Sequence, residues 1–375
     1  MKLLKNERFV AVLLLSFGVF GLILSNTPAS DQIQGLKNLE LPLVHQLTLS
    51  EFVSEFGLAF FFLVIGIELR HEFDHGIFKS PKAALSPTLA AAFGVIVPIL
   101  SFLLVVGLDS QYTRGWAIPT ATDVTFSLAI FALFGGALSR QARSYLLAVV
   151  VIDDIIAIVL IAVVFSKNIN LQNLLLALIC LATIRWLSNT VRPRQLLVVS
   201  YATQALLSLA VWFLLLESGI HASIAGVAIA FALPKTKLSQ IEQHFSPWVN
   251  GLVLPLFAFF STAIAAQNAN VFTPLTIALL TAPLAKLLGI SFGGWIGYKI
   301  IRASKAESVA TRELVAIASL GGIGFTVALL VSKLSFDKPE ISEQATLALL
   351  ITTFVAIVFG ALMLKLLSAK QKRIS

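Results

Sequence analysis

Charged residues and cysteine are scarce in this sequence. Asp, Glu, Lys and Arg make up 12% of the 375 residues, whereas apolar residues make up 58%. A soluble globular protein has roughly a quarter of its residues charged, so this composition excludes a soluble fold. The one cysteine, Cys180, excludes an intrachain disulfide and a cysteine-based metal site. We therefore expect an integral membrane protein that consists of a single transmembrane domain over residues 1–375.

The net charge of +8 does not indicate a nucleic-acid partner. The basic residues stand in short clusters between apolar runs, as expected of a chain whose loops encode membrane topology. The first apolar run follows Lys2, Lys5 and Arg8 in the manner of a secretory signal. No clean cleavage site follows it, so we interpret it as a retained first helix.

Twelve apolar runs are long enough to cross or nearly cross a bilayer, which requires about 20 residues for each helix. Strand alternation is absent, and lipid admits only helices or closed barrels, so the sequence predicts an all-α, polytopic membrane protein. The runs are Phe9–Leu24, Phe52–Leu69, Ala84–Leu108, Trp116–Leu138, Tyr145–Phe165, Leu171–Leu187, Leu196–Leu216, Ile220–Leu233, Val249–Ala266, Leu275–Ile301, Leu314–Val331 and Ala345–Leu367.

The distribution of Lys and Arg predicts the orientation of these helices. With twelve crossings, 21 of the 27 basic residues fall on the side of the N-terminus and five on the other side. Lys286 remains inside the membrane. Because positive charge marks the cytoplasmic side, we expect both termini in the cytoplasm and the long segment Ser25–Ser50 outside.

Two of the predicted helices are interrupted by helix-breaking residues. The fourth contains Pro119 just before Asp123, and the eleventh contains three glycines between Leu320 and Thr326. A glycine in a membrane helix can also be only a packing contact. The two breaks, however, take the same place in helices 3–5 and 10–12, two sets of opposite direction. This is the pattern of an inverted-repeat transporter whose ion site lies where two unwound segments cross.

Four charged residues lie in the middle of the apolar runs: Asp123, Asp153, Asp154 and Lys286. A charge at that depth is costly, and such residues usually mark a path for ions or protons. Adjacent residues on a helix point about 100° apart, so Asp153 and Asp154 should have different roles. Carboxylates, with hydroxyl and carbonyl oxygens near Thr122, suit a small hard cation, so we expect a site that holds either protons or a metal cation.

Seven segments together resemble the NhaA-type sodium/proton antiporters of bacteria, and they occur in that family's order along nearly the whole chain. They are Phe60–Leu69, Gly115–Asp123, Ala148–Asp154, Ser218–Gly226, Leu254–Phe259, Lys286–Ile290 and Gly321–Thr326. The resemblance implies an electrogenic, pH-regulated antiporter in the bacterial inner membrane that expels Na⁺ or Li⁺ in exchange for protons. No cofactor is implied. It also implies a homodimer, with a core bundle near residues 84–166 and 272–368 and an interface bundle near 9–75 and 171–266.

The resemblance also implies roles for individual residues. Asp154 would be the principal Na⁺ or Li⁺ ligand, with Asp153 and Thr122 beside it. Asp123 and Lys286 would offset the charges of the half-helix ends, although Lys286 alternatively pairs with Asp153.

A further set would respond to pH: Glu68, Glu72, Glu242 and His221. By composition alone, Glu68 and Glu72 also fit solvated charges at a helix end. One segment departs from the family, because Phe260–Ala263 stands where Asn-Ala-Gly is usual.

Two other functions compete with antiport. An intramembrane aspartyl protease would use mid-membrane aspartates as a catalytic dyad, but the Gly-x-Gly-Asp pattern of such proteases is absent. A sodium-coupled symporter of organic solutes would keep the fold and change the cargo. We expect a transporter rather than an enzyme.

Overall fold

The structure is a computed structural model. It describes residues 3–41, 47–75, 80–136, 138–166, 168–190, 197–265, 272–301 and 309–371. These residues form helices and connecting loops, and the only strand-like pairing among them is an isolated bridge between Glu40 and Thr48. Part of the predicted external segment (42–46) and the run ends Leu196 and Ala266 lie outside the described residues.

Every predicted apolar run coincides with a helix or a pair of helices. The α-helices are α1 (Glu7–Leu24), α2 (Ser30–Lys37), α3 (Leu49–Phe52), α4 (Leu58–His75), α5 (Pro81–Val106), α6 (Val124–Phe134), α7 (Arg140–Val164), α8 (Leu171–Thr190), α9 (Leu197–Glu217), α10 (Ala225–Ala232), α11 (Leu238–Trp248), α12 (Leu254–Thr262), α13 (Pro274–Ile300), α14 (Thr311–Ala318), α15 (Thr326–Ser335) and α16 (Pro339–Gln371). Shorter turns of 3₁₀- or π-helix are η1 (Leu3–Lys5), η2 (Val53–Gly57), η4 (Thr113–Thr120), η6 (Ala222–Ile224), η7 (Lys235–Lys237) and η8 (Val249–Val253).

Within the described part of the chain, nine helical stretches are long and apolar enough to cross a membrane. A tenth forms if η4 and α6 are counted as one span bent by 43°. The two remaining predicted runs are the short helix α10 and the interrupted pair α14 and α15. The number twelve thus stays a prediction, whereas the multi-pass helical architecture is confirmed.

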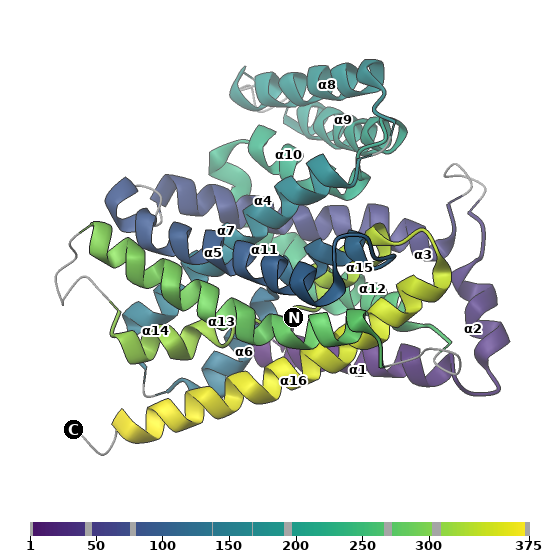
Figure 1. Cartoon of the computed structure of the whole chain (residues 1–375). Coiled ribbons are helices and arrows are strands. Elements are labelled where there is room, and N and C mark those ends of the chain that lie inside the picture. Colours follow the sequence, from purple (N-terminus) through teal and green to yellow (C-terminus); the bar gives the residue numbers. More distant parts are fainter. Residues whose placement is uncertain are drawn as a thin grey trace.

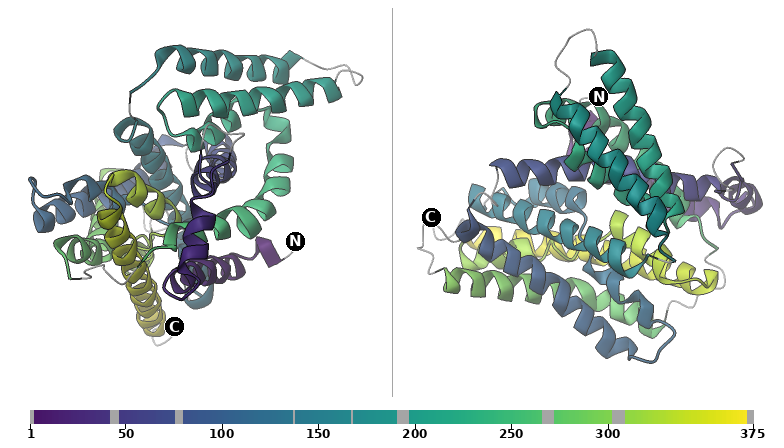
Figure 2. Two further views of the ribbon diagram at one scale, coloured as in Figure 1. Left: turned by 90° about the vertical axis from the view of Figure 1, so that its right-hand side faces the viewer. Right: turned by 90° about the horizontal axis from the view of Figure 1, so that it is seen from above.

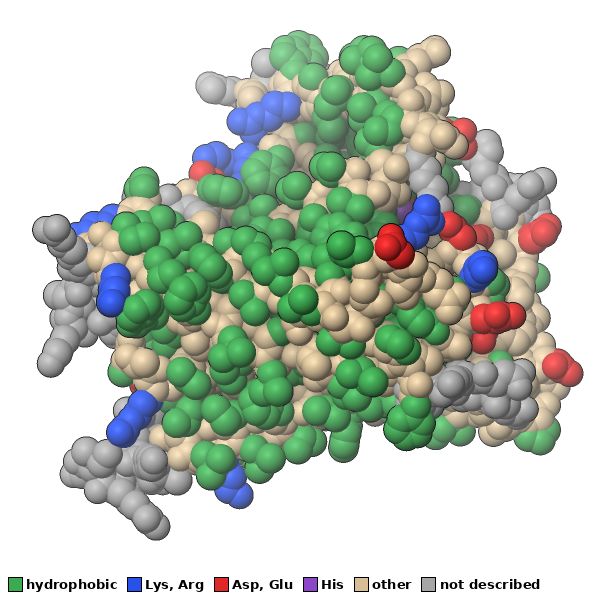
Figure 3. Space-filling model, viewed as in Figure 1, with side chains coloured by type: hydrophobic (Ala, Val, Ile, Leu, Met, Phe, Trp, Pro, Cys, Tyr) green, Lys and Arg blue, Asp and Glu red, His purple; other side chains and the backbone are tan. Residues whose placement is uncertain are grey.

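The surface of the molecule has the distribution expected in a bilayer. Apolar side chains cover most of the face in Figure 3, and charged side chains gather toward its left and right ends. The long helices run between these two ends in Figure 1, with the C-terminus at the left and α2 and α3 at the right. A multi-pass membrane protein therefore accounts for both the packing and the surface.

Helices α5 and α13 pack closely together, and small residues make this possible. A Cβ on Gly289 or Gly293 would lie 2.3 Å from the carbonyl oxygen of Phe93 or Leu89, respectively. A Cβ on Gly297 would lie 2.4 Å from the Cα of Ser86. Such spacing of small residues lets two membrane helices pack backbone against backbone.

At the edge of the molecule, α8 and α9 lie side by side next to α10 (Figures 1 and 2). Here α10 packs on α4 so closely that a Cβ on Gly226 would overlap the Ala59 carbonyl. Arg70 of α4 is buried and donates hydrogen bonds to the carbonyl oxygens of Ala230 and Leu233, at 2.8 and 2.5 Å. It therefore satisfies carbonyls that the end of α10 leaves open, in addition to marking topology.

The segment that departs from the family packs against α1. The hydroxyl of Thr262 donates to the Gly18 carbonyl oxygen at 2.6 Å, and Phe259 contacts Phe20 with 5.9 Å between ring centroids. A Cβ on Gly21 would lie 2.4 Å from the Phe259 carbonyl oxygen. Thr262 of the departing segment, together with Phe259 before it, therefore packs α12 against α1.

Candidate functional site

Two interrupted helices cross near the centre of the molecule. One break separates η4 from α6 at residues 121–123, and the other separates α14 from α15 at residues 319–325. The backbone N–H of Asp123 donates to the Ile323 carbonyl oxygen at 2.7 Å. At this contact a Cβ on Gly324 would lie 2.7 Å from the carbonyl oxygen of Ala121, so only glycine fits there. The crossing predicted from the sequence is present.

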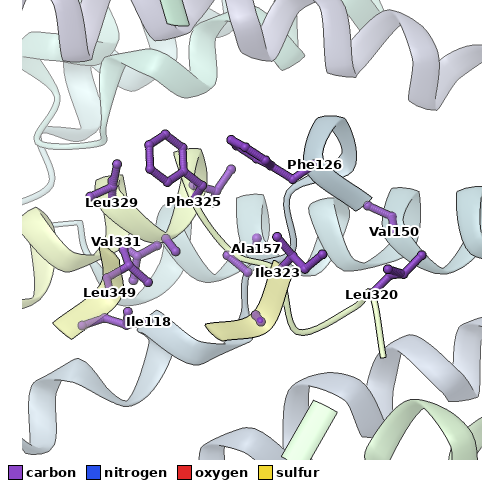
Figure 4. Packing of buried hydrophobic residues seen from close by; sticks show 14 of the residues in the cluster. Ile118, Phe126, Val150, Ala157, Leu320, Ile323, Phe325, Leu329, Val331 and Leu349 are labelled. Carbon is purple, nitrogen blue, oxygen red and sulfur yellow. The ribbon is translucent and has the colours of Figure 1, made fainter. Parts of the chain in front are cut away.

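Apolar side chains from several elements surround the crossing (Figure 4). Phe126 of α6 meets Phe325 edge to face, with 5.2 Å between ring centroids. Val150 and Ala157 of α7 and Leu349 of α16 belong to the same buried cluster. Apolar side chains thus make up much of the surroundings of these polar atoms, and electrostatic interactions are stronger there than in water.

Asp123 binds the N-termini of both half-helices. Its Oδ2 accepts hydrogen bonds from the backbone N–H and the hydroxyl of Thr326, at 3.1 and 2.8 Å. Its Oδ1 accepts from the backbone N–H of Phe126 at 3.3 Å. Thr326 begins α15 and Val124 begins α6, so one carboxylate faces two partial positive charges.

Lys286 is fully buried and bridges α13 to α7 and to the break before α6. Its Nζ lies 2.8 Å from Oδ2 of Asp153 and 2.6 Å from Oγ1 of Thr122. The Thr122 hydroxyl in turn donates to the Gly321 carbonyl oxygen, at 2.7 Å. The ammonium group therefore interacts with Asp153 directly and with the unwound segment after α14 through Thr122.

Asp154 points to a different place from its neighbour. It lines a cavity of about 160 Å³ together with Glu68, Thr122, Asp123 and Thr326, whereas Asp153 is not part of that lining. Among the residues that the structure describes, none forms a hydrogen bond with the Asp154 carboxylate. The pair is thus divided into one aspartate bonded to Lys286 and one that faces the cavity.

The cavity extends from Asp154 toward the beginning of α1, where Lys5 and Glu7 line it. Acidic groups outnumber basic ones along it, and the carboxylates of Asp153, Asp123 and Glu68 all act electrostatically on Asp154. A cleft lined by one sign of charge raises the local concentration of the opposite ion. The cavity therefore favours cations.

The four residues expected to respond to pH do not lie together. Glu68 is near Glu72 and Glu242, and Glu242 lies 3.8 Å from His71. His221 instead lies 2.9 Å from Glu55, which precedes Glu68 by 13 residues. That spacing along a helix corresponds to about 20 Å, so His221 belongs to the opposite end of α4.

Three residues of the crossing and its surroundings were not singled out from the sequence. Thr326 holds Asp123, and the Ser127 hydroxyl donates to the Leu320 carbonyl oxygen at 3.0 Å. Buried Glu313 accepts from the backbone N–H and the hydroxyl of Ser139, both at 2.8 Å. Two of them could have been found from their positions in the sequence. Ser127 follows Asp123 by one helical turn, and Glu313 directly precedes an apolar run.

In the described part of the chain, no three His, Cys, Asp or Glu side chains gather as they would around a tightly held metal ion. Oxygen ligands for a cation are nevertheless concentrated in the cavity, where the Asp154 carboxylate faces Thr122 and Thr326. Carboxylate and hydroxyl oxygens are the ligands that hard cations prefer.

Comparison with known proteins places the chain in one family. The sequence profile of the family described as Na⁺/H⁺ antiporter 1 matches residues 1–364. The Na⁺/H⁺ antiporter NhaA 2 of Clavibacter michiganensis is 39% identical over 384 residues, covering 99% of this chain and 93% of that protein. The Na⁺/H⁺ antiporter NhaA of Tropheryma whipplei (strain Twist) is 33% identical over 382 residues, covering 100% and 97%.

A solved structure supports the fold. The sodium proton antiporter MjNhaP1 of Methanocaldococcus jannaschii superposes with a TM-score of 0.56 and covers 99% of both chains. The sequences are 16% identical, so the likeness concerns the arrangement of the helices alone.

Proposed function

This chain belongs to the Na⁺/H⁺ antiporter 1 family, and we propose that its exchange of Na⁺ for H⁺ takes place in the cavity that ends at Asp154. Na⁺/H⁺ antiport is the activity of the family, and it makes the protein a secondary transporter rather than an enzyme. The organic-solute symporter and the aspartyl protease are therefore not retained.

The proposal rests on the different surroundings of the two adjacent aspartates. Asp153 is bonded to Lys286, whereas Asp154 faces the cavity without a hydrogen-bond partner among the described residues. A lone buried carboxylate is costly as an anion, so it takes up either a proton or a cation. Asp154 is the principal ligand in this scheme, with oxygens of Asp153 and Thr122 completing the cation site.

Exchange follows from competition at this one site. With Na⁺ bound or with protons bound, the site is compensated and the transporter changes its accessible side. The uncompensated form crosses slowly because it would carry a bare carboxylate through the dry centre of the protein. The cavity that reaches Lys5 and Glu7 corresponds to the state open toward the N-terminal side.

Lys286 makes the exchange electrogenic in this proposal. Na⁺ bound between the two aspartates competes with the Lys286 ammonium for Asp153. The net charge moved in each cycle then depends on whether the displaced Lys286 keeps or releases its proton. Asp123 supports the same site by offsetting the positive ends of α6 and α15, and Thr122 links Lys286 to the opposite, carbonyl-bearing ends.

The remaining features of the proposal concern the whole molecule. Li⁺ shares the Na⁺ site because it is also a small hard cation. Glu68, Glu72, Glu242 and His221 adjust exchange to pH. The core bundle, near 84–166 and 272–368, moves against the bundle near 9–75 and 171–266. The protein is a homodimer in the bacterial inner membrane, and both of its termini are cytoplasmic.

The test is a fluorescence-quench measurement of proton movement in everted membrane vesicles. After respiration acidifies the vesicles, added Na⁺ or Li⁺ should restore fluorescence, whereas K⁺ at the same concentration should not. The result should hold without any organic solute. A response to K⁺ equal to that with Na⁺, or a response that needs a solute, would contradict the proposal.

A further inference from the structure

A second pocket, of about 600 Å³, lies where the first residues of α5 and α7 meet the last residues of α13. It shares no lining residue with the cavity at Asp154. The C-terminal end of α13, at the left of Figure 1, marks its position at one of the two ends of the transmembrane helices. It is therefore a separate site, outside the proposed transport path.

The charge of this pocket is positive. Lys82 and Arg140 line it, and no acidic residue does so among those that the structure describes. The carboxylate of Glu313 lies nearby, but its two oxygens accept the hydrogen bonds from Ser139. The pocket therefore attracts an anion.

The neutral groups of the lining also suit a phosphate. Ser80, Ser144, Tyr145 and Tyr298 bring hydroxyl groups to the same pocket. Ser80 is the N-cap of α5, so that the helix directs its positive end to this place. Hydroxyl groups, basic side chains and a helix N-terminus are the groups that bind phosphate oxygens in proteins.

Hydrogen bonds next to the pocket connect three helices. The Tyr145 hydroxyl lies 2.9 Å from the Ser86 hydroxyl oxygen, and Ser86 donates to the Gly294 carbonyl oxygen at 3.0 Å. The rings of Tyr145 and Tyr298 are 5.7 Å apart. A ligand held here would contact α5, α7 and α13 at once.

The surroundings identify the source of the phosphate. Lys299 lies over the ring of Trp295 at 3.8 Å, and Trp and Lys at a helix end mark the membrane interface. Trp295 and Ile300 are exposed on the same end of α13, so apolar surface continues from this end into the bilayer. Basic pockets between transmembrane helices bind lipid headgroups.

We propose that this pocket binds the phosphate-bearing headgroup of an anionic membrane lipid and thereby holds α7 against α13. These two helices carry Asp153 and Lys286, and Tyr145 precedes Asp153 by about two helical turns. Bound lipid therefore stabilises the arrangement in which the buried ion pair forms. The inference does not depend on which ion the protein exchanges.

The test uses the purified full-length chain in a zwitterionic detergent, with the thermal unfolding midpoint as the readout. Phosphatidylglycerol should raise the midpoint by about 5 °C more than phosphatidylcholine does. Lys82→Gln/Arg140→Gln should lose most of this difference. Arg185→Gln/Lys365→Gln removes the same charge from two exposed residues outside the pocket and should keep it.

Inorganic phosphate tests whether the pocket binds a lipid headgroup or free phosphate. If phosphate at the same concentration does not raise the midpoint, the lipid headgroup is the ligand. An equal rise with phosphate would overturn the assignment to a lipid. A pocket variant that responds to phosphatidylglycerol as the control variant does would overturn the site itself. The single variants Lys82→Gln and Arg140→Gln, each with a smaller expected loss, serve if the double variant does not fold.

Discussion

Lys286 and Asp153 form a buried ion pair between α13 and α7, with 2.8 Å from Nζ to Oδ2. Both side chains are nearly inaccessible, at 1% and 4% exposure. Two charges removed from water are tolerated only together, because each is costly without the other. The pair therefore links the stability of the fold to the chemistry of the site.

Removing either partner should destabilise the protein, and removing both should restore part of the loss. Lys286→Gln and Asp153→Asn each leave one uncompensated buried charge, at a cost of about 3 kcal/mol. The double variant leaves two neutral amides and should unfold closer to the wild-type temperature. Thermal unfolding of all four proteins gives the coupling. Additive losses in the double variant would show that the two residues do not act as a pair.

Lys286→Gln should also weaken the voltage dependence of exchange. One charge moved through 100 mV is worth about 2.3 kcal/mol, so removing it changes how steep a Na⁺ gradient the protein maintains. Lys286→Arg keeps a charge that does not release a proton easily. Transport into proteoliposomes under an imposed potential provides the measurement. A Lys286→Gln protein with a lowered unfolding temperature but a wild-type response to potential would limit Lys286 to a structural role.

Asp154→Asn should abolish exchange while the fold is preserved. The amide neither releases a proton at accessible pH nor offers a charged ligand. Because the Asp154 carboxylate forms no hydrogen bond with the described residues, the substitution breaks none. Calorimetric Na⁺ binding at alkaline pH measures the effect. Asp109→Asn, the same change at an exposed position, is the control. Undiminished Na⁺ binding by the Asp154 variant would transfer the ligand role elsewhere.

Asp123→Ala should destabilise the crossing more than Thr326→Val. The first change removes a charged acceptor from the start of two helices, at about 3 kcal/mol, and the second removes one hydroxyl, at about 1 kcal/mol. Thr346→Val is a matched control, since that hydroxyl only donates to Ser342 within α16. Unfolding temperatures should fall in that order. Equal temperatures for the Asp123 variant and the wild type would mean that the helix ends need no carboxylate.

Glu68 and His221 should affect the response of exchange to pH on opposite faces of the membrane. Glu68→Gln removes a negative charge that holds protons in the cavity, so exchange should begin at a more acidic pH on the cavity side. His221→Gln should alter the response only to the pH on the opposite side, where His221 contacts Glu55. Oriented vesicles with separately buffered faces measure this. If both variants respond to the same face, the assignment of sides is wrong.

The sequence predicted the parts of the fold that depend on local pattern. Apolar runs predicted the long apolar helices but not α2 or α11. Pro119 and the glycines after Leu320 predicted the two breaks, since these residues interrupt a helix wherever it lies. The four buried charges were found because lipid makes them costly. The resemblance to a known family supplied the roles that the residues alone left open.

Contacts between distant segments were not predictable in this way. No residue near Arg70 in the sequence indicates that its side chain binds the carbonyl oxygens at the end of α10. In the topology prediction it is one of the 21 basic residues on the side of the N-terminus. Likewise, Thr326 follows Asp123 by 203 residues in the chain, so their contact is visible only in the folded structure. The separation of His221 from Glu242 also depends on the packing of α10 and α11 against α4, which composition does not encode.

The backbone contact between α5 and α13 offers a fixed reference distance for studies of the transport cycle. Gly289, Gly293 and Gly297 leave no gap that could open or close without separating the two backbones, so their distance should be the same in every state. Spectroscopic labels at exposed positions of these helices, such as Leu104 and Leu288, would calibrate such an experiment. Any distance that changes against this reference then reports the motion of the cycle itself.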